Sequence, residues 1–185
     1  SLGSTQGAVV DDANKTIHLY QQDSNGYATF HASRVNGYSY SDTALTIYGS
    51  SVKDIISGSS KADTISSGSG NDQVFGQEGA DTINLGTGDD VAFVNADDLT
   101  TDSAINGGDG SDTLNFGTVY NLSSSRSADT SVNINMASLG NATNFENLVG
   151  TISGADTLTG DNNPNVLIGS GASDVPYGKG GNDSL

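Results

Sequence analysis

Aspartates recur at a fixed interval through the middle of the sequence. They stand nine residues apart, at Asp54, Asp63, Asp72, Asp81 and Asp90. Two positions after each one comes an apolar residue, in order Ile56, Ile65, Val74, Ile83 and Ala92. The residues before each aspartate are rich in Gly, Ser and Asn, which favour turns. Carboxylates beside such turns can offer side-chain and main-chain oxygens to a hard cation, so this pattern favours coordination of an ion such as Ca²⁺.

The same interval returns further along the chain. Its members are Asn147, Asp156, Asn165, Asp174 and Asp183. The apolar residues two positions later are Val149, Leu158 and Leu167, whereas Pro176 follows Asp174. Because proline lacks an N–H group, we expect a local distortion of the structure at Pro176.

One further copy, residues 107–115, lies between the two arrays, with Asp112 as its aspartate. Its register requires a four-residue insertion after Phe93. Ile105 is then the preceding inward-facing residue.

The nine-residue unit has a direct structural meaning. It accommodates a six-residue turn and a three-residue strand in which only the middle side chain points inward. Two units make a coil with one strand in each of two facing parallel sheets. This predicts two edges, one with Asp54, Asp72 and Asp90 and the other with Asp63 and Asp81. With strands about 4.8 Å apart, oxygens from successive turns can share one ion at about 2.3–2.6 Å, and glycines with positive φ let turn carbonyls face it.

These residues resemble the RTX (repeats-in-toxin) family of calcium-binding nonapeptides, whose pattern is G-G-x-G-x-D-x-U-x with U apolar. The resemblance covers about residues 49–115 and 142–185. It implies an all-β fold, a right-handed parallel β-roll, and several bound Ca²⁺ ions. Lys53, Lys61 and Ala172 replace glycines of the pattern, and Asn147 and Asn165 replace its aspartate, so these copies are expected to bind calcium weakly or not at all. The implied ligands, through side-chain or main-chain oxygens, are Asp54, Asp63, Gly68, Gly70, Asp72, Gly76, Gly79, Asp81, Gly86, Gly88, Asp90, Gly107, Gly110, Asp112, Asp156, Gly169, Gly171, Asp174 and Asp183.

The repeats divide the chain into four predicted segments. Residues 1–48 are predicted to form a non-repeat β cap, and residues 49–115 the first β-roll block. Residues 116–141 are predicted as an insertion that forms one wider coil, with a strand within 131–136, and residues 142–185 as a second, truncated block.

Residues 1–48 carry patterns of their own. Short strands are expected at 16–20, 27–31 and 45–48. A cap fits the need to cover an open sheet end. Alternatively, the tyrosines of this segment form a glycan-binding face together with Arg34 and Asn36.

The composition excludes several classes of protein. The chain has 185 residues, with 6 Lys and Arg against 22 Asp and Glu and a net charge of −16, which argues against a nucleic-acid partner. It has no cysteine for disulfides and no long apolar run for a transmembrane helix. His18 and His31 belong to no HExxH motif, and GxSxG is absent, so we expect no enzymatic activity.

The predicted core is a single column of aliphatic side chains. At about 1.5–3 kcal/mol per buried side chain, it barely offsets the ordering of so many glycines. Stacked aspartates add repulsion. We therefore expect calcium binding and folding to be coupled.

Together these features favour a calcium-binding structural or adhesive module of a secreted bacterial surface protein, of adhesin or surface-layer type. The RTX resemblance implies type I secretion and folding in external calcium. For an adhesive module, the partner expected besides calcium is a cell-surface glycan or a second copy of the chain. The alternative is an accessory secretion or polysaccharide-binding domain of a secreted protease, lipase or alginate epimerase. Thr64 and Thr82 also face outward, as in ice-binding solenoids, but Gln73 and Val91 hold the alternate positions.

Overall fold

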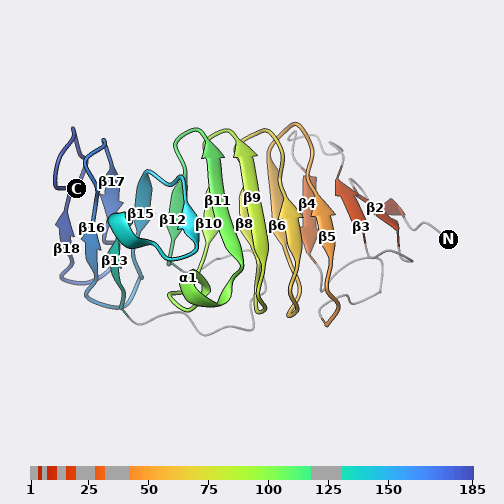
Figure 1. Ribbon diagram of the computed structural model, residues 1–185, viewed down its shortest axis with the longest axis horizontal. Helices are drawn as coiled ribbons and strands as arrows, with labels where there is room; N and C mark the ends of the chain where they lie inside the picture. The colour runs from red at the N-terminus through yellow and green to blue at the C-terminus, as the bar shows by residue number, and fades with distance from the viewer. Residues whose placement is uncertain (1–3, 6–7, 12–15, 20–27, 32–41, 118–130) are drawn as a thin grey trace.

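The computed structural model describes residues 4–5, 8–11, 16–19, 28–31, 42–117 and 131–185. These residues form a β-solenoid whose coils stack along the long axis of the molecule (Figure 1). Among them, no helix has the length and apolar content needed to cross a membrane.

Two large sheets and one small sheet build the solenoid. In spatial order, the first sheet holds β1 (Ser4–Thr5), β2 (Ala8–Asp11), β3 (Thr16–Leu19), β5 (Thr46–Tyr48), β7 (Thr64–Ser66), β9 (Thr82–Thr87), β11 (Ala104–Asp109) and β14 (Ala142–Thr143). The second holds β17 (Val166–Ile168), β15 (Asn147–Val149), β12 (Thr113–Asn115), β10 (Val91–Phe93), β8 (Gln73–Phe75), β6 (Asp54–Ser57) and β4 (Ala28–His31). The third holds β13 (Asn133–Asn135), β16 (Thr157–Thr159) and β18 (Val175–Tyr177).

The repeat strands have the predicted geometry. In β7 and β10 only the middle position is buried, occupied by Ile65 and Ala92, whereas in β8 Phe75 is buried in addition to the middle residue Val74. β6, β8 and β10 pair in parallel in one sheet, and β7 and β9 pair in parallel in the other. This confirms the predicted alternation of the repeats between two edges.

The insertion after Phe93 lies where the spacing placed it. It contains α1 (Asp98–Thr101), after which the chain enters β11. Ile105 in β11 pairs with Ile83 in β9 and is completely buried. The inward position of Ile105 is therefore confirmed.

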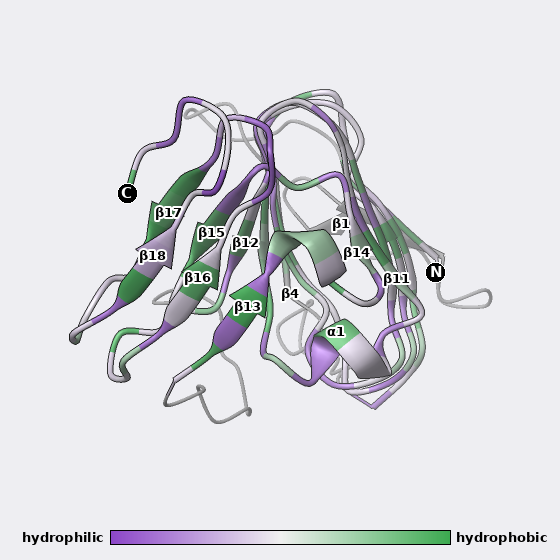
Figure 2. Ribbon diagram, turned by 60° about the vertical axis from the view of Figure 1, so that its left-hand side comes forward, coloured by the Kyte–Doolittle hydropathy of each residue, from purple (hydrophilic) through white to green (hydrophobic). Residues whose placement is uncertain are grey.

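The coil between β12 and β15 contains more than one strand. It includes β13, the 3-10 helix η1 (Met136–Ser138) and β14. Because β13 starts the third sheet and β14 ends the first, the two sheets meet in this coil. Figure 2 shows β13, β16 and β18 as a layer separate from β11 and β14.

The non-repeat residues before Gly49 contribute strands to both large sheets. β3 pairs in parallel with β5, and β4 pairs in parallel with β6. Only β1–β2 and β2–β3 are antiparallel among the described pairs. Arg34 and Asn36, named for a glycan-binding face, lie outside the described residues.

Two expectations for the second array are wrong. Asn147 was expected at the aspartate position of a repeat and Val149 at its inward position. Instead, Asn147 pairs with Thr113, the residue after Asp112, and Leu148 rather than Val149 is fully buried. The distortion expected at Pro176 is also absent, because β18 pairs with β16 in unbroken register. β18 lies at an edge of the third sheet, where a missing N–H group can face away from the neighbouring strand.

Candidate metal site

The repeat aspartates form ladders of hydrogen bonds between coils. The backbone N–H of Asp54 donates to Oδ1 of Asp72 at 2.8 Å, and that of Asp72 donates to Oδ1 of Asp90 at 2.7 Å. On the other edge, the N–H of Asp63 donates to Oδ1 of Asp81 at 2.8 Å. Each carboxylate therefore uses one oxygen to hold the preceding coil on its edge.

The ladders include two acidic residues that are not among the predicted ligands. After Asp112, the next carboxylate is that of Glu146, whose Oε2 accepts from the Asp112 N–H at 2.8 Å. On the other edge, the N–H of Asp81 donates to Oδ1 of Asp102 at 3.2 Å. Apolar Leu148 follows Glu146 by two positions, but Val149 follows Asn147 in the same way, so spacing alone does not distinguish the two; the insertion around α1 breaks the spacing that would have pointed to Asp102.

Four buried carboxylate oxygens lack any hydrogen-bond partner in the described structure. They are the Oδ2 atoms of Asp72, Asp81, Asp90 and Asp112. All four residues are completely buried. A buried carboxylate oxygen without a donor is unfavourable unless a cation or a proton compensates it.

The turns beside these oxygens present main-chain carbonyls to one another. Gly86 and Gly88 have φ values of 101° and 134°, conformations that side chains rarely adopt. A Cβ atom added to Gly86 would lie 2.0 Å from the Gly68 carbonyl oxygen, and one added to Gly88 would lie 1.8 Å from that of Gly70. Glycine is thus required where each turn lies against the carbonyls of the turn before it.

Burial also changes the acidity of these carboxylates. It raises the pKa of Asp72 from 3.8 to about 7, of Asp81 to about 8 and of Asp90 to about 6. In each case removal from water is the largest cause, and neighbouring acidic side chains add to it. At neutral pH, Asp81 therefore favours a proton unless a cation binds, and Asp72 is about half protonated.

The donor set suits a hard cation. The described residues contain no group of three or more His, Cys, Asp or Glu side chains arranged to hold a metal ion. A bound ion would therefore need main-chain oxygens in addition to carboxylates, and calcium accepts such mixed oxygen ligands in flexible geometries. The unpartnered Oδ2 atoms and the glycine carbonyls fit calcium in this way.

The remaining predicted ligands fall into distinct surroundings. Gly76, Gly107 and Gly169 lie against the carboxylates of Asp81, Asp112 and Asp174. Gly70, Gly79 and Gly110 have positive φ, as does Gly68, while Gly171 lies against the Ile152 carbonyl. Asp174 and Asp183 are only half-buried. The assignment of these residues as calcium ligands stays a prediction.

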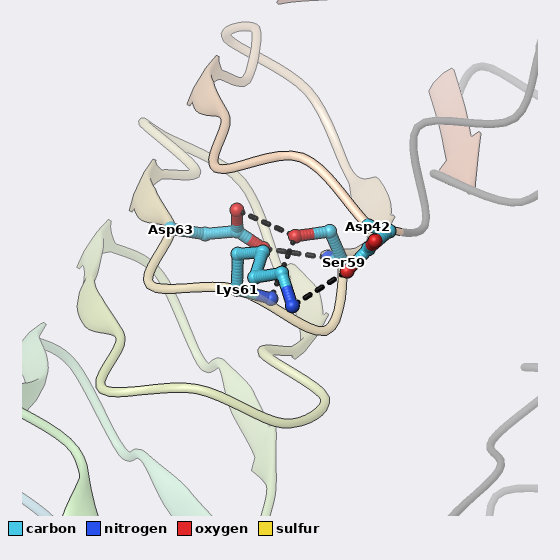
Figure 3. A network of polar contacts seen from close by, with 4 residues as sticks. All are labelled: Asp42, Ser59, Lys61 and Asp63. Carbon is cyan, nitrogen blue, oxygen red and sulfur yellow. Dashed lines mark hydrogen bonds and ion pairs between the residues drawn. The ribbon is translucent and has the colours of Figure 1, made fainter.

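Asp63 shows a different arrangement, visible in Figure 3. Ser59 donates from its backbone N–H to Oδ2 of Asp63 at 2.6 Å and from its hydroxyl to Oδ1 at 2.9 Å. The Lys61 ammonium forms an ion pair of 2.5 Å with Asp42, both side chains being exposed. The carboxylate of Asp63 is thus already supplied with donors from its own turn.

Stacked glycine turns, a ladder of aspartates and parallel three-residue strands together define a calcium-binding β-solenoid. The profile of the RTX calcium-binding nonapeptide repeat matches the chain in four copies, at residues 48–83, 57–92, 102–119 and 151–185. These matches cover just over half of the chain, which therefore belongs to the RTX nonapeptide-repeat family. No curated protein matches it significantly. Repeats of this family form structural calcium-binding modules, and proteins that contain them are typically secreted.

Proposed function

We propose that the chain is a structural or adhesive module of a secreted bacterial surface protein, of adhesin or surface-layer type, that folds when it binds calcium outside the cell. The observation that carries the proposal is the set of four buried Oδ2 atoms without partners, each in a turn whose neighbours present carbonyl oxygens. Calcium between such turns would compensate the buried charge and join successive coils.

The distribution of apolar contacts supports the same dependence on calcium. The inward residues of the first sheet form one column, with Ile47, Ile65, Ile83 and Ile105 in successive strands. The opposite sheet adds a second row, which includes the small side chain of Ala92. With a net charge of −16, so narrow a core favours folding only weakly without a cation.

Circular dichroism during a calcium titration tests the proposal. In excess chelator the far-UV spectrum should show reduced β structure, and calcium should restore it. Magnesium at equal ionic strength serves as the control, because it demands shorter, octahedral coordination and should restore little. A fully folded spectrum in chelator, unchanged by calcium, would contradict the proposal.

The adhesive role makes its own prediction. A rod that joins or anchors cell-surface proteins should self-associate or remain on the cell surface in calcium and be released by chelator. Analytical ultracentrifugation and cell-binding assays with and without calcium measure these effects. A chain that folds with calcium but stays monomeric and unbound would instead favour an accessory role in a secreted enzyme.

A groove where the sheets meet favours a second candidate, polysaccharide binding by an accessory domain. It has a volume of about 510 Å³ and is lined in part by Asn144, Asp161 and Asn163 next to Met136. Amide and carboxylate groups beside an apolar side chain can bind sugar hydroxyls and the apolar faces of sugar rings. A glycan array with and without calcium tests this candidate, and Asn163→Ala should weaken any binding that it detects.

A further inference from the structure

The nonapeptide turns belong to two backbone classes. The classes differ at the residue four positions before the final Asp or Asn, or five positions in the longer turn before Asp156. In one class this residue has a positive φ, between 70° and 109°, and is Gly68, Gln77, Gly86, Gly108, Ser170 or Lys179. In the other class φ is not positive, and the residue is Ser50, Ser59, Thr151 or Asp161.

We call the first class open turns, which end at Asp72, Asp81, Asp90, Asp112, Asp174 and Asp183. The second class, closed turns, ends at Asp54, Asp63, Asp156 and Asn165.

In the closed turns, the differing residue hydrogen-bonds to the final side chain of the turn. Its backbone N–H donates to Oδ2 at 2.6 Å in three turns, from Ser50 to Asp54, from Ser59 to Asp63 and from Thr151 to Asp156. In the fourth, the N–H of Asp161 donates to Oδ1 of Asn165 at 2.9 Å. The backbone of a closed turn therefore supplies a donor where an ion would otherwise be needed.

Hydroxyl groups complete the closure of the three aspartates. The Ser50 hydroxyl lies 3.1 Å and 3.0 Å from the two carboxylate oxygens of Asp54. The Thr151 hydroxyl lies 3.0 Å and 3.2 Å from those of Asp156. Such N–H and O–H donors favour the charged form of a carboxylate without a metal and so oppose the effect of burial, which is larger and raises the pKa of Asp54 and Asp63 above 3.8.

Open turns lack this closure. Near Asp72, the Ser67 hydroxyl lowers the pKa of the carboxyl, but the hydrogen bond that it donates, of 2.7 Å, goes to the Leu85 carbonyl. Oδ2 of Asp72 remains without a partner, as do the Oδ2 atoms of Asp81, Asp90 and Asp112. Each of these oxygens belongs to a completely buried aspartate.

The position of the open turns along the solenoid is also uneven. Asp72, Asp90 and Asp112 end three successive turns on one edge, joined by bonds of 2.7 Å and 2.9 Å. Asp81 lies alone on the other edge, between the closed turn of Asp63 and the Asp102 carboxylate. Ions shared between adjacent turns are therefore best accommodated along the run from Asp72 to Asp112.

We propose that the closed turns hold an internal substitute for calcium, so that the coils ending at Asp54 and Asp63 fold without the ion and calcium orders the open turns from Asp72 to Asp112. The proposal rests on the calcium-dependent folding proposed above and locates it within the chain. It removes Asp54, Asp63 and Asp156 from the predicted ligands. Folding would then start from a metal-independent end and extend through the open turns as calcium binds.

Hydrogen exchange measured by mass spectrometry on the full chain tests the proposal. In chelator, the amides of residues 49–54 and 58–63 should remain protected, whereas those of 67–72, 85–90 and 107–112 should exchange freely. Calcium should slow exchange in the second group by at least about a hundredfold and in the first by less than about threefold. If chelator exposes both groups and calcium protects them together, the proposal is overturned. If calcium changes no segment, the proposed function fails instead.

Two neighbouring serines supply a matched pair of variants. Ser50→Ala removes the hydroxyl that contacts Asp54, whereas Ser51→Ala alters an exposed serine with no hydrogen bond to its side chain in the described structure. In chelator, Ser50→Ala should speed exchange in residues 49–54 by about tenfold or more, and Ser51→Ala should change it by less than about twofold. Equal behaviour of the two variants would overturn the role given to the hydroxyl.

Discussion

The amide nitrogen of Asp72 lies 2.7 Å from Oδ1 of Asp90, one coil further along the chain. Because Oδ2 of Asp90 has no partner, the two oxygens of this carboxylate have separate roles. Oδ1 fixes the spacing of the coils, and Oδ2 remains available for a cation. A substitution can therefore remove the charge and keep the hydrogen bond.

Asp90→Asn should weaken calcium binding more than it disturbs the coil. Asparagine keeps an oxygen for the Asp72 amide but loses the charge that attracts the ion. We expect the calcium concentration at half-folding to rise about tenfold or more. A calcium titration followed by circular dichroism measures it, and native mass spectrometry counts the ions.

Asp89→Asn is the control for this experiment. Asp89 is exposed, and its Oδ1 accepts the Ser111 N–H at 3.0 Å, a bond that an amide oxygen can also accept. The Asp89→Asn variant loses the same formal charge as Asp90→Asn but keeps every buried carboxylate. The midpoint of its calcium titration should therefore shift little. Equal shifts for the two variants would show that only the overall charge matters.

Acid should stabilise the calcium-free protein. Burial raises the pKa of Asp81 from 3.8 to about 8, so folding is penalised as pH rises from about 4 to about 8, where the unfolded carboxyl is ionised and the folded one is not. In chelator, thermal stability should therefore be higher at pH 5 than at pH 8. With calcium the direction should reverse, because carboxylate ligands must lose their protons.

Asp81→Asn isolates this carboxyl from the general effect of charge. Its amide cannot ionise, and its oxygen can still accept the Asp63 N–H. In chelator at pH 8 the variant should be more stable than the parent chain, and in calcium it should be less stable. A variant that is less stable in both conditions would contradict the assignment of the pH effect to Asp81.

Much of the fold could be predicted because its determinants are local in sequence. A side chain in the middle of a three-residue strand must point inward, so the apolar residues at fixed intervals placed Ile65 and Val74 correctly, and a four-residue insertion placed Ile105. The edge of the solenoid on which each aspartate lies could be predicted because successive repeats alternate between the two sheets. Glu146 was missed because Leu148 and Val149 are both apolar, and only strand pairing shows which of them is inward.

The outward face shows a similar limit of sequence reasoning. Gln73 and Val91 do not interrupt the threonines at Thr64 and Thr82, because they lie in the opposite sheet. Within the first sheet, Thr64 pairs with Thr82 on one side and with Thr46 on the other. Thr46 lies outside the aspartate repeat, so the spacing gave no reason to include it.

The two classes of turn could not be separated by residue type. Ser50 and Ser170 occupy equivalent places before Asp54 and Asp174, yet only Ser170 has a positive φ, of 85°. Lys179 also takes a positive φ, of 70°, at a place where glycine is usual. The backbone conformation follows from the stacked neighbouring turns, which a single nonapeptide does not specify.

Gly88→Ala should disrupt the run of open turns. Gly88 has a φ of 134°, and an added Cβ would lie 1.8 Å from the Gly70 carbonyl oxygen. We expect a loss of at least about 2 kcal/mol in stability and a lower calcium count. Gly180→Ala is the matched control, because its Cβ would come no closer than 3.3 Å to another residue and its φ is not positive. If the two variants are equally stable in calcium, a steric clash between a Cβ at position 88 and the Gly70 carbonyl oxygen is ruled out.

Leu114→Ala should test how far calcium can compensate for a loss of core packing. Leu114 is completely buried in β12, between Ala92 of β10 and Leu148 of β15. Since Ala92 offers little side chain to fill the space, we expect a loss of about 2–5 kcal/mol in urea denaturation at saturating calcium. The midpoint of the calcium titration should also rise, because the ion must then stabilise a weaker fold.

Ile168→Ala is the corresponding surface change. Ile168 lies in the same sheet but is 49% exposed, so its truncation should alter stability by less than about 0.5 kcal/mol. If Leu114→Ala is as stable as Ile168→Ala at saturating calcium, the ions rather than the aliphatic column hold the coils together. If only Leu114→Ala loses much stability, the bound ions do not replace the aliphatic column, and the coils require both the ions and a packed core.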